Sequence, residues 1–245
     1  MLPRMLFPRD GYSVIGHRGM KLPGPVAEQT AVEFIEMLDL PRGACLLDTT
    51  GGAWAARVAG RWACGVAHAG THTPADGLPT AAPHDARHYL WCDLFGFVPD
   101  RSYDLVLCTR APLSDGTMPD HLVAARELLK PGGQLLLGAG YWRLPPSAAF
   151  LRKSGLRSGE MFGLGATLAS AEEHGFRVKH WVSSPPKEWD GYEERFRENL
   201  LQWADRNAAH PESPAVRAHA EEWFKTYKVE GKYVVGFALL LLEAE

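Results

Sequence analysis

The stretch LDTTGGAWAARVAG, residues 47–60, decides the expected fold. Its first residues end the apolar run ACLLD, residues 44–48, which has the length and composition of a buried parallel strand that finishes on an acid. Gly51 and Gly52 then mark a turn, and AWAARVAG is typical of a short helix. A strand, a glycine turn and a helix in this order form the first unit of an alternating α/β fold.

The same alternation continues to the end of the chain. After residues 44–48, the sequence predicts strands at 62–66, 88–93, 103–110, 134–140, 177–184 and 232–243. It predicts helices at 25–39, 53–60, 118–130, 166–176, 187–208 and 214–227. Residues 67–87 contain Pro74, Pro79 and Pro83, a density that excludes a helix and predicts an exposed loop. We therefore expect a doubly wound, mostly parallel, seven-stranded α/β sheet that ends with an added, antiparallel member.

Length and charge indicate a single-domain protein that neither binds nucleic acid nor spans a membrane. A chain of 245 residues fits one domain, in which we expect a lid at 1–40, a core at 41–140 and a substrate-side half with a helical cap at 141–245. The net charge of −3 offers no basic surface for nucleic acid. The longest apolar runs are too short to cross a membrane, and the proline-broken start lacks a signal-peptide core, so we expect a cytoplasmic protein.

Neither the cysteines nor the histidines predict a metal site. The cysteines form no CxxC pair and lie in or beside apolar runs, which favours small buried side chains over zinc ligands or disulfides: Cys45, Cys64, Cys92 and Cys108. Four histidines surround the proline-rich loop: His68, His72, His84 and His88. Their spacing would place ligands together only on a helix, which the prolines exclude, so we expect no metal.

Several segments resemble the class I S-adenosylmethionine (SAM) dependent methyltransferases. They are the strand, acid, turn and helix at 44–60, WCDLFGFVPDRSYDLVLCTRAPL at 91–113 and LLKPGGQLLLGAGYWRLPP at 128–146. PPKEWDGYEERFRENLLQW at 185–203 and KYVVGFALL at 232–240 resemble a bacterial subgroup that acts on small molecules. The resemblance implies a Rossmann-like fold with an N-terminal helical lid, C-terminal helical additions, SAM as cofactor and a small-molecule substrate.

The resemblance also implies which residues meet the cofactor, and where this chain departs from the family. The implied residues are Asp48, Gly51, Gly52, Trp54, Asp93 and Leu94. Thr50 and Trp54 stand where the family has glycines, and Ala67 stands where it has the carboxylate that holds the ribose hydroxyls. A lost charge-assisted contact of that kind costs about 1.5–3 kcal/mol, and an indole would compete with the ligand for volume. We therefore expect weak or absent SAM binding in the usual pose, unless a shifted pose forms.

Candidate catalytic residues come from two places. The resemblance places His17, before the first long helix, in a lid over the pocket, where a side chain of reference pKa near 6.5 suits a general base; the alternative is a surface histidine on a mobile terminus. Tyr141, Trp142 and Arg143 follow a strand at the carboxyl edge, where open α/β sheets bind ligands. There Tyr141 would hydrogen-bond a substrate, Trp142 would form a wall of the pocket, and Arg143 would pair with a carboxylate. The alternative is that this segment packs against the C-terminal helices.

Two further residues are candidates for the substrate side. Arg110 ends a predicted strand, where it suits an anionic ligand or pairs with Asp115. Tyr192 shares one predicted helix face with Trp189 and Phe196, which indicates core packing or a cap that excludes water from the pocket.

Two functions follow from this pattern. The first is SAM-dependent methylation of a small metabolite in a specialised, natural-product pathway. The second is a methyltransferase-fold protein that no longer uses SAM, either an enzyme of the cyclase or isomerase type or a non-catalytic partner of an active homologue. A homodimer and a complex with a homologous protein both stay open.

Overall fold

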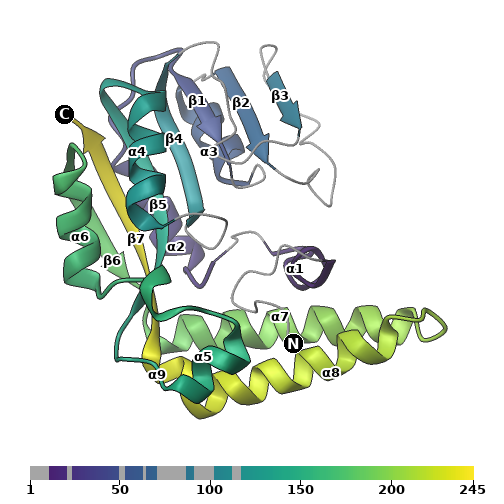
Figure 1. Ribbon diagram of the computed structural model, residues 1–245. Helices are drawn as coiled ribbons and strands as arrows, with labels where there is room; N and C mark the ends of the chain where they lie inside the picture. Colours follow the sequence, from purple (N-terminus) through teal and green to yellow (C-terminus); the bar gives the residue numbers. More distant parts are fainter. Residues whose placement is uncertain are drawn as a thin grey trace.

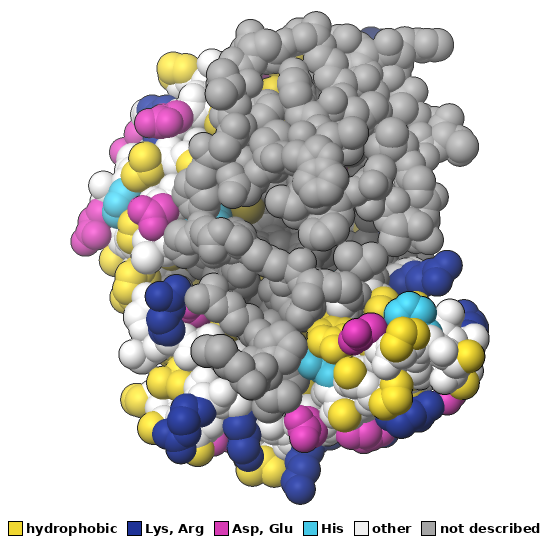
Figure 2. All heavy atoms as spheres, turned by 45° about the vertical axis from the view of Figure 1, so that its right-hand side comes forward, with side chains coloured by type: hydrophobic (Ala, Val, Ile, Leu, Met, Phe, Trp, Pro, Cys, Tyr) yellow, Lys and Arg dark blue, Asp and Glu magenta, His cyan; other side chains and the backbone are white. Residues whose placement is uncertain are grey.

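The computed structural model describes residues 11–20, 24–49, 53–62, 65–70, 87–90, 102–111 and 117–245. A twisted sheet with helices on both faces stands above a pair of long helices that run side by side (Figure 1). On the face shown in Figure 2, acidic and basic side chains are interspersed over the described surface, as the net charge of −3 leads one to expect.

The sheet is mixed and mostly parallel, as the alternating sequence predicts. Its strands are β1 (Cys45–Asp48), β2 (Gly65–Gly70), β3 (Arg87–Leu90), β4 (Tyr103–Ala111), β5 (Leu129–Trp142), β6 (Phe176–Ser183) and β7 (Val235–Ala244). They are hydrogen-bonded in the order β3-β2-β1-β4-β5-β7-β6. β7 runs antiparallel to both of its neighbours, while the pairs from β3 to β5 are parallel. The mixed, mostly parallel α/β fold is therefore confirmed, but the antiparallel strand β7 lies between β5 and β6 rather than at the end of the sheet.

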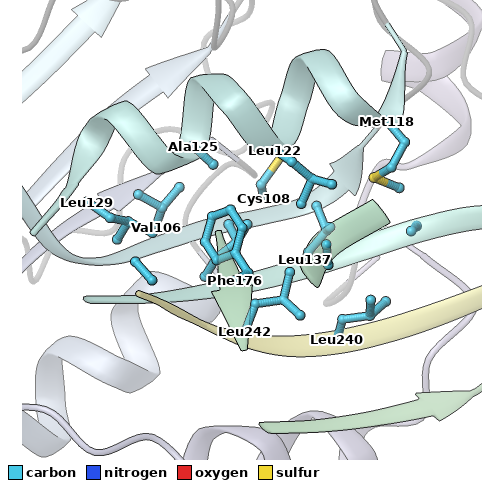
Figure 3. Packing of buried hydrophobic residues seen from close by; sticks show 14 of the residues in the cluster. Val106, Cys108, Met118, Leu122, Ala125, Leu129, Leu137, Phe176, Leu240 and Leu242 are labelled. Carbon is cyan, nitrogen blue, oxygen red and sulfur yellow. The ribbon is translucent and has the colours of Figure 1, made fainter. Parts of the chain in front are cut away.

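Helices cover both faces of the sheet because successive residues of each buried strand point to opposite sides. Leu46 and Leu105 face the cluster formed with α2 (Glu28–Glu36) and α3 (Ala53–Trp62). Leu47 and Val106 face the opposite cluster, which includes α4 (Met118–Leu128) and α6 (Leu164–Glu173). Figure 3 shows this second cluster, where the side chains of α4 point onto the sheet above Phe176.

The C-terminal half adds a helical cap at the carboxyl ends of the parallel strands. It consists of α5 (Ala148–Ser154), η1 (Ser158–Glu160), α7 (Pro186–Arg206), α8 (Ser213–Thr226), the π-helical turn η2 (Tyr227–Gly231) and α9 (Lys232–Val234). In Figure 1, α1 (Gly11–Gly16) lies between α7 and the lower edge of the sheet, toward which β1 and β2 point. No helix in the described part of the chain is long and apolar enough to span a membrane.

Some predicted boundaries are wrong. β2 covers 65–70 rather than 62–66, so residues 67–70, predicted as loop, are strand. The stretch AHAG has weak strand preference, and its parallel pairing with β1 and β3 outweighs that preference. The helix predicted to reach 130 ends at Leu128, and β7 begins at Val235 rather than 232 because the preceding residues stay helical.

Candidate functional site

The candidate site lies at the carboxyl ends of β1 and β4. Asp48 is the last residue of β1, and its side chain is fully buried. In the parallel ladder it pairs with His68 of β2 and Leu107 of β4. The amide and the hydroxyl of Thr49 both donate to the Leu107 carbonyl, at 3.0 and 2.9 Å, so the chain stays tied to β4 as it enters the turn. Gly51, Gly52, Asp93 and Leu94 lie outside the described residues.

Trp54, the second residue of α3, lies in the hydrophobic core. Its side chain is 2% exposed and belongs to the cluster that includes Phe34 of α2, Val58 of α3 and Leu105 of β4. This placement argues against the expectation that the indole competes with a ligand at the strand edge. Its Nε1 is buried and has no hydrogen-bond partner in the described structure.

The carboxylate that would hold a ribose is still missing from β2, for a reason that differs from the one expected. Ala67 pairs with Leu47 inside the parallel ladder, and the strand continues to Gly70. The sequence predicted that the strand ends near Ala67, but β2 ends at Gly70. The sequence of β2, GVAHAG, contains no acid at all.

The structure brings His17 and Tyr192 together although 175 positions separate them in the chain. His17 directly follows α1, and its Nε2 lies 2.7 Å from the Tyr192 hydroxyl. The imidazole also meets the Phe196 ring edge-on, with 5.1 Å between the ring centroids. The two residues therefore form a hydrogen-bonded pair between α7 and the segment that follows α1.

Tyr141, Trp142 and Arg143 each make contacts within the C-terminal half. The Tyr141 hydroxyl lies 2.6 Å from the Ser183 hydroxyl, and its ring lies so close over Gly236 that a Cβ there would be 2.2 Å from Cζ. These contacts are with β6 and β7, whereas the alternative that the sequence left open was packing against the C-terminal helices. Trp142 Nε1 donates to the Ser158 carbonyl at 2.9 Å, and an Arg143 Nη donates to the Ser184 carbonyl at 2.7 Å. Arg110 lies in β4, and its side chain and Asp115 fall outside the described part.

Sequence reasoning missed two buried titratable groups in the cap. Glu193 is 2% exposed and accepts a hydrogen bond from Trp223 Nε1 at 2.7 Å. Burial raises the pKa of Glu193 to about 8, and the nearby charge of Asp190 adds to the rise, while the bond from Trp223 opposes it. Its place one turn after Trp189 on an otherwise apolar helix face was the signal in the sequence.

The second missed group is His219 of α8. It is 3% exposed, its ring centroid lies 4.3 Å from that of Tyr12 in α1, and neither ring nitrogen has a hydrogen-bond partner in the described structure. Burial lowers the pKa of His219 to about 4, so the ring is neutral at physiological pH. Among the described residues, no group of three or more histidine, cysteine, aspartate or glutamate side chains could hold a metal ion, and His219 belongs to no such group.

Comparison with known proteins identifies the fold. The chain is similar to the uncharacterized protein YjhP of Escherichia coli K12, with 25% identity over 159 residues, 64% of the length of each chain. The crystal structure of E. coli YjhP superposes with a TM-score of 0.83 at 19% identity, over 95% of this chain and 98% of that one. The crystal structure of a SAM-dependent methyltransferase of Thiobacillus denitrificans, in complex with S-adenosyl-L-homocysteine, superposes with a TM-score of 0.79 at 21% identity, over 94% of this chain and 97% of that one. The chain has the class I methyltransferase fold.

The class I methyltransferase fold carries more than one chemistry. The [4+2]-cyclase SpnF superposes on this chain with a TM-score of 0.65 at 19% identity, over 88% of this chain and 80% of SpnF. No family model matches the sequence. The fold alone therefore does not decide between methyl transfer and another chemistry, and the residues of the site have to be considered with it.

Proposed function

We propose that the protein transfers a methyl group from SAM to a small metabolite in a specialised, natural-product pathway. The observation that carries the proposal is the structural match along nearly the whole chain to a SAM-dependent methyltransferase in complex with S-adenosylhomocysteine. The local geometry supports it, because the edge at Asp48 lies at the carboxyl ends of parallel strands, where open α/β sheets bind ligands.

The described residues fit the cofactor in part. Asp48 supplies a buried carboxylate at the turn, and Trp54 lies in the core, which leaves the strand edge to a ligand. The loop residues Gly51, Gly52, Asp93 and Leu94 stay assigned to the cofactor by resemblance. The missing acid on β2 removes one anchor for the ribose, so we expect an affinity roughly tenfold to hundredfold below that of a complete site.

When bound, SAM supplies an activated methyl group, so the protein has to orient the acceptor and remove its proton. The pair of His17 and Tyr192 suits proton removal when His17 Nε2–H donates to the phenol oxygen, because Nδ1 is then free to take the proton of the acceptor in a fixed orientation. We therefore expect an acceptor with an ionisable hydroxyl or amine. Tyr141 and Trp142 shape the substrate side through their contacts with β6 and η1, and Arg143 does so through the Ser184 carbonyl.

Titration with S-adenosylhomocysteine in a calorimeter tests the proposal. We expect saturable binding and a melting temperature that rises with ligand concentration as mass action requires. Asp93→Ala should weaken binding by removing the implied adenine contact. Asp205→Ala, which removes an ion pair with Arg217 on the outer face of the cap, is the matched control and should bind normally. Absence of binding at millimolar ligand would exclude the proposal.

The alternative is a protein of the same fold that does not transfer methyl groups. The acid-free β2 and the similarity to a cyclase favour it. Incubation with radiolabelled SAM and metabolite extracts separates the two: labelled product supports methyl transfer. Binding of S-adenosylhomocysteine without any labelled product supports a reaction of the cyclase or isomerase type. Stable co-purification with a homologue supports a non-catalytic partner.

A further inference from the structure

Three side chains of α7 form a seat for the segment that carries His17. Tyr192, Phe196 and Asn199 follow one another at helical spacing on the face of α7 that contacts α1. Tyr192 binds the His17 imidazole, and Phe196 meets it edge-on. The third member, Asn199, holds the backbone on both sides of His17.

Asn199 binds two carbonyls at once. Its Nδ2 donates to the carbonyl of Gly16 at 2.8 Å and to that of Arg18 at 2.9 Å. α1 ends at Gly16, and the last carbonyls of a helix have no partner within the helix. One amide group therefore caps the end of α1 and fixes the residue between its two acceptors, which is His17.

A close approach of the backbone makes the seat specific. A Cβ on Gly16 would lie 2.1 Å from Cε2 of Phe196, far inside van der Waals contact. Phe196 is 3% exposed and belongs to a core cluster with Leu200 and Val216, so its ring cannot move aside at low cost. Only glycine at position 16 allows α1 to lie against α7 at this distance.

We propose that Asn199 is a positioning residue that sets the orientation and the tautomer of His17. This inference rests on the proposed function, in which His17 is the base. By fixing both flanking carbonyls, Asn199 holds the imidazole within hydrogen-bond distance of Tyr192, where Nε2–H donates to the phenol oxygen, keeps the ring proton on Nε2 and leaves Nδ1 free. Without the clamp, the end of α1 is free to move and His17 exchanges between tautomers as a free imidazole does.

Nitrogen NMR of histidine-labelled protein tests the proposal without a substrate. The ¹⁵N shifts of His17, assigned with His17→Gln, should show one dominant tautomer in the wild type. Asn199→Ala and Asn199→Asp should shift them to the tautomer mixture of a free imidazole. Asn207→Ala is the matched control, because Asn207 Nδ2 also caps a helix, at the Trp203 carbonyl, but lies at the far end of α7. That variant should leave the His17 shifts unchanged.

Gly16→Ala disturbs the contact between α1 and α7 from α1, because its Cβ would overlap the Phe196 ring. It should shift His17 to the same tautomer mixture. Binding of S-adenosylhomocysteine, measured on every variant, should stay within about twofold of the wild-type affinity. Unchanged His17 shifts in both Asn199→Ala and Gly16→Ala, or an equal change in Asn207→Ala, would overturn the assignment. Failure of the proposed function has a different signature, because the wild type itself would then fail to bind S-adenosylhomocysteine.

Discussion

Trp54 makes two opposing contributions to stability: a fully enclosed ring and an indole N–H without a partner. Trp54→Gly removes the ring from the core beneath α3 and places glycine in a helix. Loss of a buried tryptophan costs about 3–5 kcal/mol, and glycine in a helix adds about 1 kcal/mol. We expect urea denaturation to show destabilisation of that order, and S-adenosylhomocysteine affinity in the folded fraction not to improve. Tighter binding at unchanged stability would show that the ring obstructs the ligand after all.

Trp54→Phe separates the two contributions, since it keeps an aromatic ring and removes the N–H group. Relief of an unsatisfied buried donor is worth about 1–3 kcal/mol, which offsets the smaller volume of phenylalanine. We expect a free energy of unfolding within about 1 kcal/mol of the wild type. Trp62→Phe, at the half-exposed end of the same helix, is the control for the substitution itself. A loss as large as that of Trp54→Gly would mean that the N–H has a partner in the native protein.

At the scale of elements, the interface between α1 and α8 depends on the charge of His219. The pKa of His219 falls from 6.5 in the unfolded chain to about 4 in the fold, so the unfolded state binds a proton that the native state does not between these values. Stability from this group is complete above pH 6.5 and is lost as the pH falls toward 4. His219→Leu should therefore stabilise the protein by about 1–2 kcal/mol at pH 7, because it removes two unpartnered nitrogens, and by more at pH 5.

Urea denaturation at the two pH values measures this effect. His210→Leu is the control, because His210 is exposed beyond the C-terminal end of α7 and packs edge-on against Trp203. The change of stability in that variant reports the loss of the Trp203 contact and of the hydrogen bond that the Glu212 amide donates to His210 Nδ1, not the loss of a buried ring without partners. An equal stability of His219→Leu and wild type at pH 5 would show that α1 leaves His219 accessible to water.

Elements with a strong periodicity could be predicted from the sequence, whereas contacts between distant segments could not. α7 and α8 were predicted at 187–208 and 214–227 and lie at Pro186–Arg206 and Ser213–Thr226, because their apolar residues recur at helical spacing. The end of β2 was missed because alanine and glycine carry no alternation. The seat of His17 on α7 has no sequence signature, since a hydrogen bond across 175 positions depends on the folded chain alone.

At the scale of the whole molecule, two buried groups give stability opposite dependences on pH. His219 makes stability rise with pH up to 6.5. Glu193 has the reverse effect: its pKa rises from 4.5 to about 8, so the native state retains a proton that the unfolded chain releases, and stability falls as the pH rises between those values. The two effects oppose each other up to about pH 6.5, and above it only that of Glu193 remains. The carboxyls of Asp190 and Glu243, whose pKa values are lowered, add a loss of stability in acid.

This balance predicts that the protein is most stable in mildly acidic solution and weakens toward pH 8. A difference of one bound proton changes stability by about 1.4 kcal/mol per pH unit, so the free energy of unfolding should fall by roughly 1.5 kcal/mol between pH 6.5 and 8. Glu193→Gln keeps an acceptor for Trp223 without an ionisable proton and should remove that fall, so that it exceeds the wild type in stability at pH 8. Glu198→Gln, on the exposed face of the same helix, should keep the wild-type slope. Urea denaturation across this range measures all three proteins, and a slope that survives in Glu193→Gln would show that the carboxyl between α7 and α8 is ionised and solvated in the native state.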